Sequence, residues 1–164
     1  MVGVELTEAI GPLVMLIAFS AIMPILGYIE GRLKYKYLTG IATSIGFLLA
    51  LAYLVRFSWS YWSLLAGGEI LTTSFPMFGP PLGVEIRIDA LSIFMSMLFL
   101  GLGFLVSVYS IRYMEHDTGL DRYYAMLLLL VAGMVGVAIA GDFFTLFVFW
   151  ELMSISSYSL VAFR

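Results

Sequence analysis

Five long apolar stretches, separated by shorter polar segments, dominate the pattern of the chain. A helix that crosses the apolar core of a bilayer needs about 20 predominantly apolar residues. The pattern therefore predicts an all-α integral membrane protein in which residues 1–164 form a single membrane domain. The predicted spans cover residues 9–29, 38–57, 90–111, 123–140 and 143–163.

The segment 58–89 differs from these stretches, because it is polar and rich in Gly and Pro. Within it, residues 84–89 alternate strictly between apolar and charged side chains, which is typical of a half-buried strand. A second short strand within residues 70–78 would complete a β-hairpin between the second and third spans. Two interpretations stay open for this external segment: a loop that lies on the membrane surface, or a hairpin that also contacts a partner subunit.

Composition strengthens the membrane assignment and narrows the chemistry. The chain is 62% hydrophobic and 12% charged, with a mean hydropathy of +1.05, whereas soluble domains are about half apolar and a quarter charged. It has no cysteine and a single histidine, His116, so we expect no cofactor and no metal cluster in this chain. A net charge of −3 and the absence of a nucleic-acid-binding motif predict no nucleic-acid partner.

The basic residues of the short connections predict the orientation. The connections 30–37 and 112–122, with Arg164, hold six basic residues, whereas Arg56 and Arg87 are the two on the opposite side. Basic residues are in excess on the cytoplasmic side of membrane proteins. The N-terminus is therefore expected outside the cell and Arg164 in the cytoplasm.

Glu151 lies in the apolar run FWELMSISSY, near the middle of the fifth predicted span. It follows Asp142, the expected helix N-cap at the outer rim, by nine residues, which places it about 13 Å deep in the membrane. A charge at that depth costs several kcal/mol unless it is protonated, paired or hydrated. Acids inside the membrane are functional candidates by default, so Glu151 is the first candidate for ion translocation.

Ser154 and Tyr158 follow Glu151 at spacings of three and seven residues, which places the three side chains on one helix face. A stripe of carboxylate, hydroxyl and phenol suits a proton relay. Ser156 and Ser157 point elsewhere and are expected to serve close helix packing. The alternative is structural: a protonated, buried Glu151 could hold a helix interface by a hydrogen bond.

His116 is a further candidate, because it lies in a connection expected on the cytoplasmic side. A histidine there titrates near neutral pH and could help protons to enter. The alternative is an ordinary solvated histidine without such a role.

Three runs of residues resemble one known family: VEIRIDALSIF, then VYSIRYMEHDTGLDRYYAMLLLL, then AGDFFTLFVFWELMSISSYSLVAF. In this order they are similar to the antiporter-like subunits shared by respiratory complex I, membrane-bound hydrogenases and related ferredoxin-dependent complexes, and multisubunit cation/proton antiporters. The likeness is specific from about Gly83 to Arg164, and the first two spans match by pattern alone. The chain is similar to the N-terminal five-helix portion of such a subunit.

The resemblance implies proton or sodium translocation. In the family, the glutamate that corresponds to Glu151 pairs with a lysine on a later helix, and that helix is not among these residues. We therefore expect another membrane subunit, or the rest of a longer subunit, to supply a lysine opposite Glu151. The further expected partners are the lipid bilayer and a hydrophilic electron-transfer arm.

Three functions remain open at this point. The first is an ion-translocation subunit, or the split N-terminal part of one, in a redox-driven complex of the hydrogenase or complex I type in a prokaryotic cell membrane. The chain would then be a non-redox subunit of an oxidoreductase complex. The alternatives are a subunit of a stand-alone cation/proton antiporter complex and a structural membrane scaffold.

Overall fold

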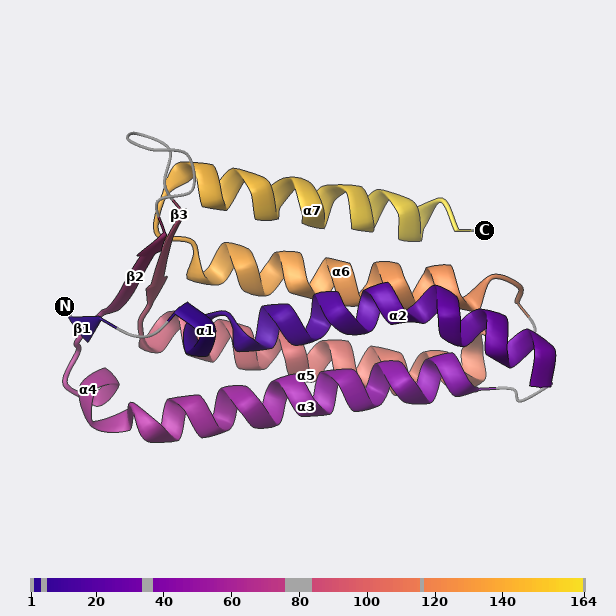
Figure 1. The fold of residues 1–164 in the computed structure, drawn as a ribbon, viewed down its shortest axis with the longest axis horizontal. Coiled ribbons are helices and arrows are strands. Elements are labelled where there is room, and N and C mark those ends of the chain that lie inside the picture. The colour runs from indigo at the N-terminus through magenta and orange to yellow at the C-terminus, as the bar shows by residue number, and fades with distance from the viewer. Residues whose placement is uncertain (1, 4–5, 34–36, 76–83, 116, 164) are drawn as a thin grey trace.

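Five long helices run side by side in the computed structural model, and a small β-sheet covers one end of the bundle (Figure 1). The structure describes residues 2–3, 6–33, 37–75, 84–115 and 117–163. All five helices are long and apolar enough to cross a membrane, as the sequence predicts. They are α2 (Gly11–Leu33), α3 (Leu38–Ser60), α5 (Ala90–Tyr113), α6 (Leu120–Ile139) and α7 (Phe143–Val161).

Four of the long helices extend beyond the predicted apolar runs: α2, α3 and α5 at their C-terminal ends and α6 at its start. The last turn of α3 includes Ser58 and Ser60, whose hydroxyls donate to carbonyl oxygens of the same helix at 2.9 and 3.1 Å. The first turn of α6 includes Asp121, a charge that the helix dipole favours at an N-terminus. Polar side chains that a helix end accommodates therefore lengthen α3 and α6 beyond what hydropathy predicts.

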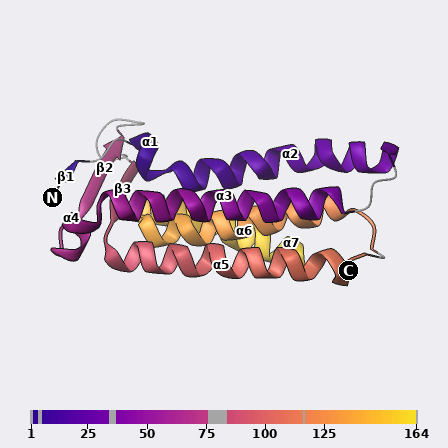
Figure 2. The ribbon, with the colours of Figure 1, turned by 90° about the horizontal axis from the view of Figure 1, so that it is seen from below.

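The sheet has three strands in the order β1–β2–β3. Strands β2 (Leu71–Phe75) and β3 (Val84–Ile88) form the predicted antiparallel hairpin, and β1 (Val2–Gly3) adds a parallel strand that the sequence pattern does not predict. Two short helices, α1 (Leu6–Ala9) and α4 (Trp62–Ala66), lie at the same end of the bundle (Figure 2). We call this the hairpin end, and the opposite end, where α2 ends and α3 begins, the loop end.

The strand β3 has one buried and one exposed face. Ile86 and Ile88 are buried, whereas Glu85 and Arg87 are exposed, so the predicted alternation is confirmed. The chain then enters α5 through Asp89, whose carboxylate accepts a hydrogen bond from the Ser92 N–H at 2.8 Å. This cap fixes where the third membrane span begins.

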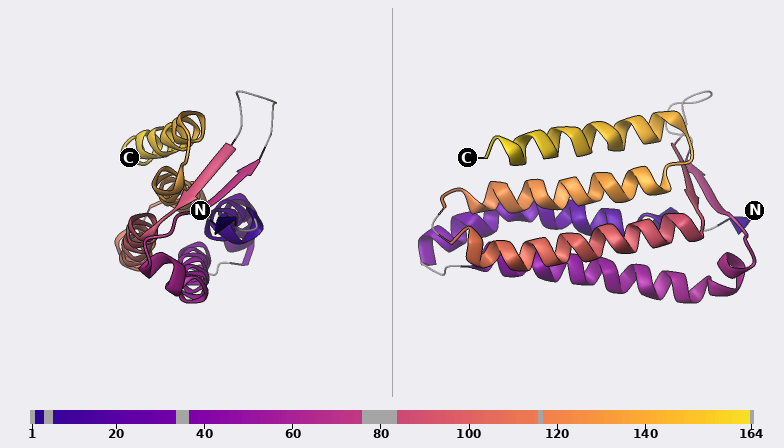
Figure 3. Two further views of the ribbon diagram at one scale, coloured as in Figure 1. Left: turned by 90° about the vertical axis from the view of Figure 1, so that its left-hand side faces the viewer. Right: turned by 180° about the vertical axis from the view of Figure 1, so that it is seen from behind.

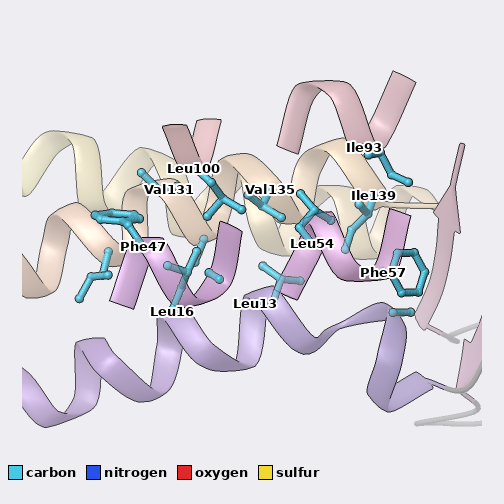
Figure 4. Close-up of a cluster of buried hydrophobic side chains, with 14 of the residues drawn as sticks. Leu13, Leu16, Phe47, Leu54, Phe57, Ile93, Leu100, Val131, Val135 and Ile139 are labelled. Carbon is cyan, nitrogen blue, oxygen red and sulfur yellow. The ribbon is translucent and has the colours of Figure 1, made fainter. Parts of the chain in front are cut away.

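The helix α6 occupies the centre of the bundle and packs against α2, α3, α5 and α7 (Figure 3). The buried core lies where the first four long helices meet, and the side chains of Leu16, Phe47 and Leu100 are fully buried in it (Figure 4). The helix α7 packs mainly on α6, with a smaller contact to β3. One face of α7 is therefore left uncovered by the described chain.

Candidate functional site

The start of α7 is held by Asp142. Its carboxylate accepts hydrogen bonds from the Thr145 N–H at 2.8 Å and from the Thr145 hydroxyl, which confirms the predicted N-cap. Desolvation acts to raise the pKa of the Asp142 carboxyl, but hydrogen bonds from Thr145 and from the Glu85 and Phe144 backbone hold this pKa below its usual value. Asp142 therefore stays ionised, and its charge favours the helix N-terminus.

The same residues tie α7 to the hairpin. The Asp142 carboxylate accepts the Glu85 N–H at 2.7 Å, and the Gly141 N–H donates to the Glu85 carbonyl oxygen at 2.8 Å. Strand β3 and the start of α7 are thus joined by two hydrogen bonds between residues more than fifty positions apart. The sequence predicts the cap but not this clamp, because no local pattern marks contacts between such distant residues.

Glu151 is the ninth of the 19 residues of α7, close to the middle of the span. The face of α7 that packs on α6 includes the buried side chains of Thr145 and Ser156. At about 100° per residue, Glu151 projects about 140° around the helix from Ser156. Its side chain is exposed, and it has no hydrogen-bond or ion-pair partner among the described residues.

Ser154 and Tyr158 share this outward face with Glu151. Both are exposed, Tyr158 to 75%, and both lie about 160° around the helix from Ser156. The Ser154 hydroxyl donates to the Trp150 carbonyl oxygen at 2.9 Å, so it is engaged with its own helix. The structure therefore places the three candidates on one uncovered stripe, while their role in a relay stays a prediction.

The packing serines differ from each other. Ser156 is buried at 1% exposure against α6, as expected for close helix packing, whereas Ser157 is exposed. Helix phase explains the difference, because consecutive residues point about 100° apart. The candidate His116 lies outside the described residues.

The loop end carries a carboxylate that the sequence shows only as one of several charges in a connection. The Glu30 side chain at the end of α2 accepts the N–H groups of Tyr37 and Thr39, both at 3.1 Å. It thereby caps α3 in place of Tyr37, whose own side chain makes no cap and whose φ is 84°. The Tyr37 hydroxyl donates to Glu115, and this hydrogen bond raises the pKa of Tyr37.

Comparison with known proteins points to one family. Residues 77–124 match the family model for the N-terminus of NADH-ubiquinone oxidoreductase (complex I) chain 5. The chain is 33% identical over 150 residues to the "A" component of the Na(+)/H(+) antiporter of Alkalihalophilus pseudofirmus, a match that covers 88% of this chain and 18% of that protein. It is 43% identical over 76 residues to the chloroplastic NAD(P)H-quinone oxidoreductase subunit 5 of Adiantum capillus-veneris, a match that covers 46% of this chain and 10% of that protein.

Solved structures share the fold. A chain of the archaeal membrane-bound sulfane sulfur reductase complex superposes with a TM-score of 0.75 at 24% identity, covering 92% of this chain and 29% of that one. A chain of the Mrp complex from Dietzia sp. DQ12-45-1b superposes with a TM-score of 0.66 at 26% identity, covering 92% of this chain and 15% of that one. In each of these four comparisons the match covers less than a third of the relative's length.

The chain is therefore a multi-pass membrane protein with five candidate spans, and it shares its fold with chains of two solved membrane complexes. Within that class, the resemblance to the antiporter-like subunits of Mrp and complex I-type assemblies is confirmed, and it concerns their N-terminal part.

Proposed function

We propose that this chain forms the N-terminal part of an ion-translocation subunit, with Glu151 as its intramembrane charge. One observation carries the proposal: a carboxylate lies in the middle of α7, on the face that the described chain leaves uncovered. The relatives support it, because one is a component of a Na(+)/H(+) antiporter and the family model describes a complex I chain.

The cost of a charge in the membrane explains why Glu151 needs a partner. An ionised acid at the centre of a span costs several kcal/mol unless it is paired or hydrated. The four other spans lie on the side of α7 that is opposite to Glu151, so they do not provide a partner for its outward-facing side chain. We propose that another helix supplies a lysine opposite Glu151, with Ser154 and Tyr158 carrying water-linked hydrogen bonds along the same face.

A charge pair of this kind would couple geometry to proton affinity. When the lysine and the carboxylate approach, each stabilises the charged form of the other, and when they separate, a proton is released or taken up. The ion would be a proton, a sodium ion or both, because carboxylates and hydroxyls bind either. His116 would serve proton entry from the cytoplasm.

Two kinds of assembly fit the chain equally. In a redox-driven complex, partner chains would hold the cofactors and an electron-transfer arm, as the likeness to a respiratory complex supports. In a stand-alone antiporter, an ion gradient would drive exchange, as the similarity to the Na(+)/H(+) antiporter component supports. Everted membrane vesicles separate them: a stand-alone antiporter exchanges sodium for protons without an electron donor. In either case we propose a prokaryotic cell membrane, with the hairpin end outside and Arg164 in the cytoplasm.

The test of Glu151 compares two carboxylates in the assembled complex. Glu151→Gln removes the titratable group within the span, whereas Glu85→Gln removes an exposed carboxylate at the hairpin end. We expect Glu151→Gln to abolish ion translocation in vesicles that contain normal amounts of complex, and Glu85→Gln to preserve it. Full translocation by assembled Glu151→Gln complex would favour the structural-scaffold alternative.

A further inference from the structure

The helices α6 and α7 approach each other more closely than any residue larger than glycine allows at two positions. A methyl group on Gly133 would lie 2.9 Å from the backbone nitrogen of Met153 and 3.0 Å from its Cα. A methyl group on Gly136 would lie 2.2 Å from the ring atoms Cγ and Cδ1 of Phe149. The Gly133 contact is with the backbone, so α7 would have to move to relieve it. The Gly136 contact is with the Phe149 ring close to its attachment, so either the ring or α7 would have to shift.

These two contacts bracket Glu151. Phe149 and Met153 lie two residues before and two residues after it, so the two glycines contact α7 along the turn that carries the carboxylate. Two contacts one turn apart fix both the rotation of a helix and its position along its axis. Small residues permit such close approach of helices within membranes.

A third attachment holds the start of the same helix. Gly141 and Asp142 are hydrogen bonded to Glu85 of β3, and a methyl group on Gly141 would lie 3.0 Å from the Glu85 carbonyl oxygen. This clamp and the two glycine contacts therefore hold α7 at its start and at mid-span.

We propose that Gly133 and Gly136 are positioning residues for Glu151, which set the rotation and depth of α7 so that the carboxylate meets its partner. This inference rests on the proposed function. The glycines do not touch the translocated ion. They act through the position of α7, and their effect depends on Glu151 being used.

The titratable groups on the elements that pack against α7 lie near the ends of the bundle. Those on α6 fall in its first two turns and those on β3 are at the hairpin end; the other titratable group on α7 itself is the phenol of Tyr158. The set comprises Asp121, Arg122, Tyr123, Tyr124, Glu85 and Arg87. A shift of the translocation pH profile after a change at mid-span would therefore report on the surroundings of Glu151.

The experiment replaces each glycine by alanine in the assembled complex and measures ion translocation in vesicles against pH. We expect Gly133→Ala and Gly136→Ala to lower the rate about tenfold or more, since displacements near 1 Å cost up to about 100-fold where geometry is critical. The pH midpoint is expected to shift in both. Gly101→Ala is the matched control, because a methyl group on Gly101 of α5 meets nothing within 4 Å.

A second variant separates positioning from loss of folding. Gly136→Ala combined with Phe149→Ala removes the ring that the methyl group meets, so it should recover rate and pH midpoint. Removing the Met153 side chain should not rescue Gly133→Ala, because that contact is with the backbone.

The results distinguish the inference from the function on which it rests. If Glu151→Gln stops translocation but both glycine variants keep the control's rate and pH profile, the positioning role is wrong. It is also wrong if the glycine variants lose activity only in proportion to the amount of complex. If Glu151→Gln itself retains translocation, the proposed function fails first.

Discussion

Two regions of the molecule differ in how they bury side chains and satisfy polar groups: the four-helix unit of α2, α3, α5 and α6, and the single helix α7. Buried residues make up 56% of the apolar window of α6 but 11% of that of α7. Within the four-helix unit, hydroxyls pair with each other, as Ser44 with Ser107 at 2.9 Å and Ser110 with Tyr123 at 2.8 Å. The polar stripe of α7 instead faces away from the described chain.

The contrast indicates different roles for polar groups in the two regions. In the four-helix unit several buried hydroxyls are satisfied by neighbouring groups and contribute to packing, whereas those of Thr39 and Ser96 have no hydrogen-bond partner among the described residues. On α7 a carboxylate faces away from the described chain, and we propose that a partner outside that chain meets it, because unpaired charges are costly in the membrane. We therefore propose that the first region is a scaffold and that the second is an interface built on it.

The largest stability difference should separate two phenylalanines. Phe47 is fully buried, whereas Phe147 on α7 is 59% exposed. We expect Phe47→Ala to lower the free energy of unfolding by about 3–5 kcal/mol, the usual cost of emptying a core site. Phe147→Ala should cost less than about 1 kcal/mol in the isolated chain in detergent. Equal losses in denaturant titrations would contradict the division into scaffold and interface.

Asp142 should show the next largest effect, because it joins the two regions. Asp142→Ala removes the cap of α7 and its bond to β3, and we expect a loss of about 1–2 kcal/mol. Asp142→Asn keeps most of the hydrogen-bond acceptors and should lose less. Unfolding of both variants in detergent measures the difference.

The acid dependence of stability gives an independent check on Asp142. Its pKa is lowered in the folded chain, so its contribution is present above the unfolded pKa and is lost as pH falls through the folded one. As the pH falls below about 4, the Asp142→Ala chain should therefore lose less stability than the natural chain. An unchanged acid dependence would show that Asp142 does not contribute in this way.

The smallest effect is expected inside the scaffold. A double-mutant cycle of Ser44→Ala and Ser107→Ala should give a coupling of about 0.6 kcal/mol, the average for hydrogen bonds between membrane helices. Ser154→Ala, whose hydroxyl bonds only its own helix among described residues, should change stability still less. A coupling near zero for the Ser44–Ser107 pair would remove the contrast between the two polar arrangements.

The sequence predicts those features that a local pattern encodes. Apolar run length predicts the five spans, alternation predicts β3, and the Gly141–Asp142 pair predicts the start of α7. The pairing of β1 with β2 joins residues about 70 positions apart and leaves no local signal. For the same reason, spacing groups Glu151 with Ser154 and Tyr158, but only the packing of α7 on α6 reveals that this face is uncovered.

The central claim is that Glu151 meets a basic partner and not lipid, and a map of the complete membrane complex tests it most directly. The measured quantity is the distance from the Glu151 carboxylate to the nearest lysine nitrogen of the other helices. We predict a lysine within ion-pair distance, about 4 Å, or joined to Glu151 by one water molecule. A carboxylate surrounded by lipid acyl chains would contradict it.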